Sequence, residues 1–170
     1  CPMLLAQTST EEEVSEATAV GQERREYSPL PDGFRGLKLG MPLEAAKQEL
    51  KSDGYFYYRG EPDVSLLSQP NRTVIETEGV TFIEKAFFQF HEKALYIIIL
   101  RLNDAKIDYY TMYTTLKEKY GPSDSLDPNQ VVWENTAVRL SLERPLQVKY
   151  IDVDVFNSLT KEQKADESME

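Results

Sequence analysis

The most regular hydrophobic pattern in the chain spans residues 80–102. Two runs rich in β-branched and aromatic residues are separated by the polar residues 91–93, which predicts a β-hairpin. Both faces of the second run are apolar, a pattern typical of a central strand that is covered on both sides. We expect Leu95, Ile97 and Ile99 to share one of these faces. Another part of the chain, a protein partner or a lipid-like ligand packs on that face. Which of the three does so is the main functional clue.

Shorter periodic segments on either side of this hairpin predict the rest of the fold. Leu43, Ala46 and Leu50 repeat at i, i+3 and i+7, which predicts a helix over about residues 42–53, and a tyrosine-rich segment predicts a second helix at about 105–120. Residues 64–71 are predicted to be a loop. Further strands are predicted at residues 37–39, 73–78, 131–134, 138–143 and 147–155. The predicted fold is α+β, a curved antiparallel sheet of about five to seven strands with the two helices mainly on one face.

Composition divides the chain into three parts. Residues 1–27 are polar and acidic and predict a disordered tether, residues 28–157 predict a single domain, and residues 158–170 predict a charged flexible tail. The formal net charge of −10 disfavours nucleic acid as a partner, because an acidic surface repels phosphates. The apolar runs are shorter than the roughly 18 residues that cross a bilayer.

The chain contains one cysteine, Cys1. Bacterial lipoproteins are cut immediately before a cysteine that then carries the lipid, so we expect Cys1 to be lipidated and to anchor the protein to a membrane. This places the protein in the bacterial cell envelope, facing the periplasm or the cell surface. An arbitrary boundary of the sequence is the competing interpretation. A single cysteine excludes an internal disulfide bond.

Residue types that carry catalysis or bind metals are sparse. The only histidine, His91, lies in the polar break of the hairpin, where a solvated role is expected. Asp152 and Asp154 alternate on a predicted strand, about 6–7 Å apart, which could serve acid–base chemistry in a cleft. Two acidic sets could bind calcium, although neither has EF-hand spacing: Asp104 with Asp108, and Asp124 with Asp127 and Glu134. We therefore predict no cofactor, no metal and no enzymatic activity.

Residues 55–59 form an aromatic segment that ends in an arginine. Tyrosine and arginine are enriched at binding hot spots because they combine contact area with hydrogen bonding. Alternating aromatic residues also fill sheets, so we expect at least two of the four aromatic residues to be core. The predicted interaction residues are Tyr55, Tyr57, Tyr58, Arg59, Leu95, Ile97 and Ile99.

Two segments resemble a known family. Residues 37–50 (LKLGMPLEAAKQEL) resemble the opening of the BamE (SmpA/OmlA) outer-membrane lipoproteins, and residues 116–124 followed by 131–134 resemble that family's helix end, glycine turn and strand. The beta-lactamase inhibitor proteins contain a similar helix-then-strands unit twice, and here the two matches fall in different halves, as two degenerate repeats would. An acidic tethered domain of this kind also resembles uncharacterised envelope lipoproteins, including those of spirochaetes. The resemblance implies binding or scaffolding in the envelope, without catalytic residues.

Two functions follow as expectations. The first is a non-enzymatic, lipid-anchored protein that binds or scaffolds another envelope protein, whose identity the sequence does not indicate. The alternative is a carrier or sensor that holds a small apolar ligand between sheet and helices. A hydrolase using Asp152 and Asp154 is a distant third.

Overall fold

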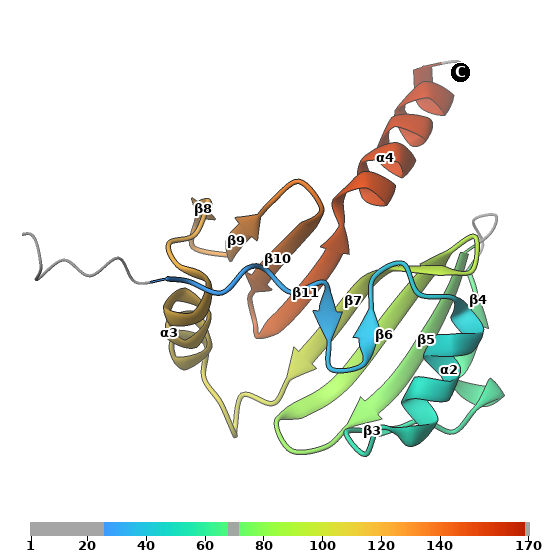
Figure 1. Ribbon diagram of the computed structural model, residues 1–170, viewed down its shortest axis with the longest axis horizontal. Coiled ribbons are helices and arrows are strands. Elements are labelled where there is room, and N and C mark those ends of the chain that lie inside the picture. Colours follow the sequence, from blue (N-terminus) through green and yellow to red (C-terminus); the bar gives the residue numbers. More distant parts are fainter. Residues whose placement is uncertain (1–25, 68–71, 169–170) are drawn as a thin grey trace, which may run out of the picture.

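The computed structural model describes residues 26–67 and 72–168 and has an α+β architecture (Figure 1). One open antiparallel sheet has nine strands in the order β3-β5-β6-β7-β11-β10-β9-β8, with β4 also paired to β5. The predicted class and antiparallel sheet are confirmed, but the expected five to seven strands and two helices are wrong, because the described residues form more strands and three α-helices. The elements are β1 (Gly33–Phe34), β2 (Leu37–Lys38), α2 (Leu43–Ser52), β3 (Phe56–Tyr57), the 3-10 helix η1 (Glu61–Asp63), β4 (Val64–Leu66), β5 (Arg72–Gly79), β6 (Ile83–His91), β7 (Ala94–Leu102), α3 (Tyr109–Tyr120), β8 (Ser125–Leu126), β9 (Gln130–Glu134), β10 (Val138–Glu143), β11 (Gln147–Asp152) and α4 (Val153–Ser168).

The two halves of the chain repeat one order of elements. In the first half α2 is followed by the short strand β3 and, after η1 and β4, by the meander β5-β6-β7. In the second half α3 is followed by the short strand β8 and the meander β9-β10-β11. The last strands of the two meanders, β7 and β11, pair antiparallel in the middle of the sheet. The halves are therefore related by an approximate two-fold axis normal to the sheet.

The helices α2 and α3 cover one face of the sheet, which we call the helix face. The predicted apolar stripe of α2 is confirmed, since Leu43, Ala46 and Leu50 are all buried. Under α3, the indole Nε1 of Trp133 donates a 2.8 Å hydrogen bond to the carbonyl of Gly121, so the polar atom of this buried ring is satisfied. The core on this face is one cluster of buried side chains that includes Leu37, Ile75, Phe88, Ile98, Leu140 and Trp133.

The register of β7 changes at Tyr96. Consecutive residues of β6 pair with Ile97 and Leu95, so Tyr96 is an extra residue and forms a β-bulge. The bulge places Leu95 on the helix face, where its exposed fraction is 0%, and leaves Ile97 and Ile99 on the opposite face. The prediction that these three residues share a face is therefore wrong for Leu95.

The C-terminal segment is helical where the sequence predicts the end of a strand and a charged tail. The strand β11 ends at Asp152, three residues earlier than predicted, and α4 follows and projects away from the sheet (Figure 1). The carboxylate of Asp152 accepts a 3.2 Å hydrogen bond from the backbone N–H of Val155. Asp154 lies in the first turn of α4, so the predicted alternation of Asp152 and Asp154 on one strand face is wrong.

Two other boundaries differ from prediction. Part of the predicted loop at 64–71 forms β4, a short strand at the edge of the sheet. The helix α3 begins at Tyr109 rather than near residue 105, because the carboxylate of Asp108 caps it by accepting a 2.6 Å hydrogen bond from the backbone N–H of Thr111.

Residues 26–42 cross the helix face and join the two halves. At one end the backbone N–H of Ser28 donates to the carbonyl of Lys119, the last residue but one of α3 (2.8 Å). At the other end the backbone N–H of Gly40 donates to the carbonyl of Leu95 at the start of β7 (2.6 Å). This segment, α2 and α3 thus leave the opposite face of the sheet accessible, except near Arg139, whose guanidinium lies 5.7 Å from the ring centroid of Phe156 on α4.

Candidate functional site

The face of the sheet opposite α2 and α3 combines apolar and charged side chains, and we call it the open face. Strand pairing places its members in rows across the sheet: Val74, Glu76 and Glu78 of β5; Lys85, Phe87 and Gln89 of β6; Ile97, Ile99 and Arg101 of β7; Gln147, Lys149 and Ile151 of β11; Arg139, Ser141 and Glu143 of β10; Val132 and Glu134 of β9.

The centre of the open face is apolar. Phe87 pairs with Ile99, and Ile97 pairs with Ile151 in the next row, so these side chains are neighbours across adjacent strands. Phe87, Ile97 and Ile99 are only half-buried, whereas Ile98 on the helix face has no exposed surface. The open face therefore leaves apolar area in water that the helix face does not.

The rim of the open face is charged and mostly ion-paired. Lys85 contacts Glu76 at 2.7 Å, and Lys149 contacts Glu143 at 3.0 Å. Acidic and basic side chains are nearly balanced here, although the whole chain carries −10. The excess negative charge of the protein therefore lies outside the open face.

Arg101 differs from the other charged residues of the rim. Its guanidinium lies 5.6 Å from the centroid of the Phe87 ring, a cation–π distance. In the ranges 26–67 and 72–168 no carboxylate forms an ion pair with Arg101, and its side chain is exposed. Arg101 thus offers hydrogen-bond donors beside the apolar centre.

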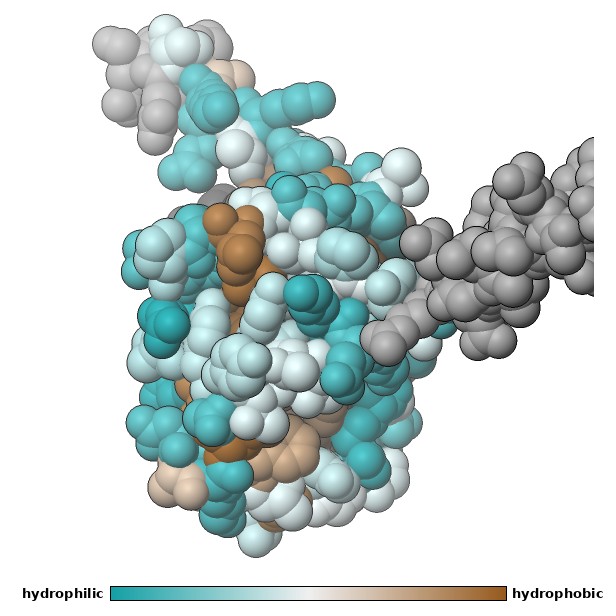
Figure 2. Space-filling view, turned by 90° about the vertical axis from the view of Figure 1, so that its left-hand side faces the viewer, coloured by the Kyte–Doolittle hydropathy of each residue, from teal (hydrophilic) through white to brown (hydrophobic). Residues whose placement is uncertain are grey.

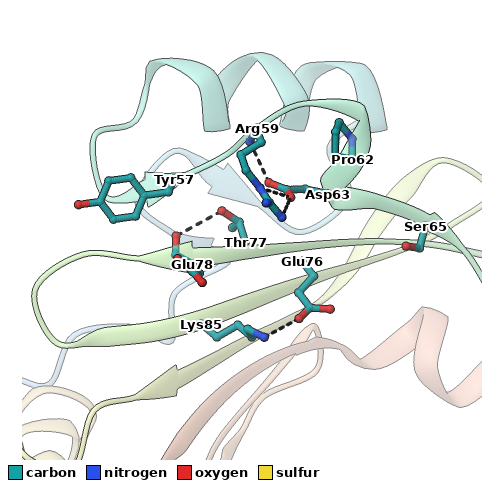
Figure 3. A pocket seen from close by; sticks show the side chains of 9 residues that line it. All are labelled: Tyr57, Arg59, Pro62, Asp63, Ser65, Glu76, Thr77, Glu78 and Lys85. Carbon is teal, nitrogen blue, oxygen red and sulfur yellow. Dashed lines mark hydrogen bonds and ion pairs between the residues drawn. The ribbon is translucent and has the colours of Figure 1, made fainter.

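A hollow of about 280 Å³ lies at the β5 edge of the open face (Figure 3). It forms because β3 pairs with residues 78–79 of β5 and β4 with residues 73–75, while the chain between β3 and β4 loops outward. Its lining is mainly polar, and Figure 3 shows Tyr57 and Arg59 at one side and Glu76, Glu78 and Lys85 at the other. The hollow is therefore continuous with the open face, because these β5 and β6 residues belong to both.

Asp63 fixes the loop that closes the hollow. Its side chain is 1% exposed and accepts hydrogen bonds from the backbone N–H of Arg59 (2.8 Å) and from the Arg59 Nε (2.9 Å), with an ion pair to Nη2 at 2.7 Å. The hydrogen bond with Asp63 raises the pKa of Arg59 above its ordinary value. Arg59 is therefore held in a defined position, although its side chain is 75% exposed.

The structure separates the four aromatic residues of the 55–58 segment. Phe56 is buried in the core, and Tyr55 lies under the guanidinium of Arg35, 3.9 Å from ring centroid to Cζ. Tyr58 is half-buried towards α2, and this burial raises the pKa of its hydroxyl above the ordinary value. Tyr57 is 62% exposed. Of the predicted interaction residues in this segment, only Tyr57 and Arg59 reach the hollow.

The remaining predicted residues fall in three places. Ile97 and Ile99 lie on the open face, Leu95 lies in the core, and Cys1 lies outside the described residues. Sequence reasoning missed Glu76, Lys85 and Arg101 as members of a site. Their only signal in the sequence was their alternation with apolar residues, which does not show which strands become neighbours.

Three of the acidic residues considered for metal binding have structural roles. Asp108 caps α3, Asp124 accepts a 2.8 Å hydrogen bond from the backbone N–H of Glu134, and Asp127 accepts from two N–H groups of the turn that follows it. Across residues 26–67 and 72–168, no three His, Cys, Asp or Glu residues are arranged to hold a metal ion. In the same part of the chain, no helix has the length and apolar character needed to cross a membrane.

Comparison with known proteins identifies a family but no characterised relative. No curated protein and no solved structure matches the chain, and nothing in these comparisons supports the resemblance to the BamE family or the lipoprotein assignment. The model of the TP0088 domain, a family associated with spirochaetes, matches residues 32–162, from within the segment that crosses the helix face into α4. The chain belongs to the TP0088 domain family.

Proposed function

We propose that this protein is a non-enzymatic binding module of the bacterial cell envelope that holds a protein partner on the open face. The observation that carries the proposal is the half-buried apolar centre of Phe87, Ile97 and Ile99 inside a rim of paired charges. An apolar centre with a polar rim is the usual anatomy of a protein–protein interface. The lipid anchor at Cys1 belongs to the same proposal and rests on the sequence alone.

The chemistry of the open face favours a partner with a carboxylate beside apolar side chains. Arg101 presents a guanidinium without a carboxylate partner from the described residues, and it is stacked on Phe87. Arginine beside an aromatic ring is a frequent hot spot, because it combines apolar contact with bidentate hydrogen bonding. The acidic remainder of the surface disfavours other approaches of such a partner and so orients it towards the open face.

The hollow adds a concave region to the open face. Tyr57 and Arg59 rise at its edge, and Asp63 holds Arg59 in place before any partner arrives. A side chain of the partner that enters the hollow would meet ordered groups, so little entropy would be lost on binding. We therefore expect the hollow to contribute specificity and the apolar centre to contribute most of the affinity.

Site-specific photocrosslinking followed by reconstitution tests the proposal. A photoreactive phenylalanine at Ile99 should give one discrete adduct in cells, whereas the same group at Thr115, an exposed residue of α3, should not. The captured protein, once purified, should bind the wild-type chain directly. Equal labelling at both positions, or an adduct protein that does not bind in purified form, would overturn the proposal.

A charge reversal gives the matched comparison. Arg101→Glu should weaken binding of the purified partner by roughly 30-fold, corresponding to about 2 kcal/mol for a hot-spot residue. Lys51→Glu makes the same charge change on an exposed position of α2 and should alter binding by less than about twofold. Equal effects of the two substitutions would show that general electrostatics, rather than the open face, determines binding.

A second candidate function is a carrier of a small apolar ligand between sheet and helices. The space between α2 and the sheet cannot hold such a ligand, because buried core side chains fill it. The observation that favours a carrier is an aromatic groove between α3 and the β8–β9 turn.

A further inference from the structure

The groove between α3 and the β8–β9 turn has a volume of about 420 Å³ and lies away from the open face. Three tyrosines of α3 (Tyr109, Tyr110 and Tyr113) form one wall, and Leu126, Pro128 and Val131 form the other. Figure 2 shows the side of the molecule on which α3 and β8 lie, where apolar atoms reach the surface among polar ones. The walls of the groove are therefore mainly apolar or aromatic.

The rims of this groove expose apolar surface that a packed side chain would normally bury. Tyr110 on the α3 side is 75% exposed, and Leu126 on the β8 side is 65% exposed. Both residues line the same groove, so their exposed surfaces are available to one ligand. A ligand between them would remove apolar area of both from water.

Arg144 lines the groove and is only partly satisfied by the protein. Its guanidinium stacks on Tyr109, 4.1 Å from the ring centroid, and its Nε donates a 2.8 Å hydrogen bond to the carbonyl of Pro128. Unlike Arg35 and Arg59, Arg144 makes no ion pair with any carboxylate in the part of the chain that the structure describes. Within the same residues, no acceptor binds its two terminal amino groups.

The two acidic residues of the groove do not neutralise Arg144. The carboxylate of Asp108 accepts from the first turn of α3, and the carboxylate of Asp127 accepts from two backbone N–H groups at 2.8 and 3.0 Å. Backbone donors thus offset part of the negative charge of each carboxylate. Among the described residues, the two terminal amino groups of the Arg144 guanidinium therefore have no carboxylate partner.

We propose that this groove binds a small apolar molecule carrying one carboxylate group, with the carboxylate on the terminal amino groups of Arg144 and the apolar body between Tyr110 and Leu126. A volume of about 420 Å³ suits a small molecule, since such sites span roughly 300–1,000 Å³. A planar guanidinium binds a carboxylate through two parallel hydrogen bonds. A cationic ligand would be repelled by Arg144, which already occupies a face of the Tyr109 ring.

A set of three matched probes tests the charge requirement. 4-Phenylbutyrate, its neutral amide and 4-phenylbutylamine share one apolar body and differ in the charge of the end group. In an NMR titration of the full chain, 4-phenylbutyrate should shift the backbone resonances of Tyr110, Leu126 and Arg144 and bind at least tenfold more tightly than the amide. Binding of the amide or the amine as tightly as the acid, or shifts confined to other regions, would overturn the proposal.

Substitutions locate the binding and separate it from the open face. Arg144→Gln should abolish the preference for the acid, and Tyr110→Ala should weaken binding at least threefold without unfolding, because Tyr110 is mostly exposed. Arg101→Gln removes the same charge from the open face and should leave the affinity for 4-phenylbutyrate unchanged. Unchanged binding by the Arg144→Gln and Tyr110→Ala variants would refute the site. Failure here leaves protein binding on the open face unaffected, since the two surfaces share no residue.

Discussion

Aspartate at Leu95, Ile97 or Ile98 of β7 should destabilise the protein to very different degrees, although the three native residues are all large and apolar. Leu95 and Ile98 lie on the helix face and are 0% exposed, whereas Ile97 lies on the open face and is half-buried. Simple strand alternation groups Leu95 with Ile97, but the bulge at Tyr96 groups Leu95 with Ile98. The three aspartate variants therefore test the bulge and the open face together.

The expected magnitudes differ by an amount comparable to the total stability of a marginally stable domain. Truncating a fully buried Leu or Ile costs about 2–5 kcal/mol, and a carboxylate without a partner in the core adds several more. Because folded domains are stable by only about 5–15 kcal/mol, Leu95→Asp and Ile98→Asp should not fold. For Ile97→Asp the lost burial costs about 1 kcal/mol, half of a full side chain, and the lower strand propensity costs about 1 more. A total of about 2 kcal/mol lowers Tm by roughly 8 °C.

Urea denaturation followed by tryptophan fluorescence measures these differences. The chain has a single tryptophan, Trp133, which is 2% exposed and hydrogen-bonded under α3, so its emission reports the packed core. Ile97→Asp should show a native spectrum and a cooperative transition at lower urea. Leu95→Asp and Ile98→Asp should show the spectrum of an unfolded chain without urea.

Two outcomes would refute the reasoning. A folded Leu95→Asp variant with a midpoint near that of Ile97→Asp would mean that the bulge at Tyr96 does not exist in solution. An unfolded Ile97→Asp variant would mean that the chain itself covers the open face, and the proposed binding surface would then be core.

Three further predictions address other parts of the molecule. Asp63→Ala should destabilise the protein by about 2 kcal/mol in urea titrations, because it leaves a partly buried backbone N–H without its acceptor. The exposed guanidinium bound to Asp63 can be hydrated instead, so a loss above about 4 kcal/mol would contradict this reasoning. The pKa of Asp108 is lowered by its hydrogen bond from the α3 backbone, so the folded state binds fewer protons than the unfolded state just below pH 4. The stability advantage of wild type over Asp108→Asn should therefore be complete above the ordinary pKa of about 4 and be lost as pH falls through the lower pKa of the folded state. A difference in Tm that does not change with pH would exclude this linkage. Labelled palmitate should be incorporated into the native chain but not into Cys1→Ser, and an unlabelled native chain would remove the proposed anchor.

Local signals predicted the hairpin and the first helix well. The polar break at residues 91–93 contains the turn between β6 and β7, which consists of Glu92 and Lys93, both at positive φ. The stripe of Leu43, Ala46 and Leu50 is buried as its spacing indicates. These features depend on residues close in sequence, which is why a pattern alone was sufficient.

Features that depend on distant pairing were not predictable in the same way. On the side of β7 away from β6, residues 94–95 pair with residues 40–42 and residues 97–101 pair with β11, so the bulge at Tyr96 lies where the partner changes. No residue type signals this change. The start of α4 was misread because Ile151, Val153 and Val155 alternate like a strand. In the structure Asp152 ends β11, and Asp154 lies in the first turn of α4.

The candidate site was predictable only in part, for the same reason. Tyr57 and Arg59 stood out by residue type, and they do line the hollow. Their partners across the hollow, Glu76 and Lys85, come from β5 and β6, and only the edge position of β3 brings them together. The groove between α3 and the β8–β9 turn was missed because the tyrosine-rich segment predicts a helix but does not show which residues lie beside it.

The pairing of β7 with β11 has a consequence for how this molecule assembles. Each meander joins strands that are neighbours in sequence, but the central ladder joins residues 97–101 to residues 147–151 and closes a loop of about 50 residues. Local hairpins form before such long-range contacts, so the closing of this central ladder should limit the rate of folding. A polypeptide severed in the connection at residues 103–108 should accordingly give two pieces, each with its own helix and meander, that recombine along this ladder and regain the native tryptophan emission.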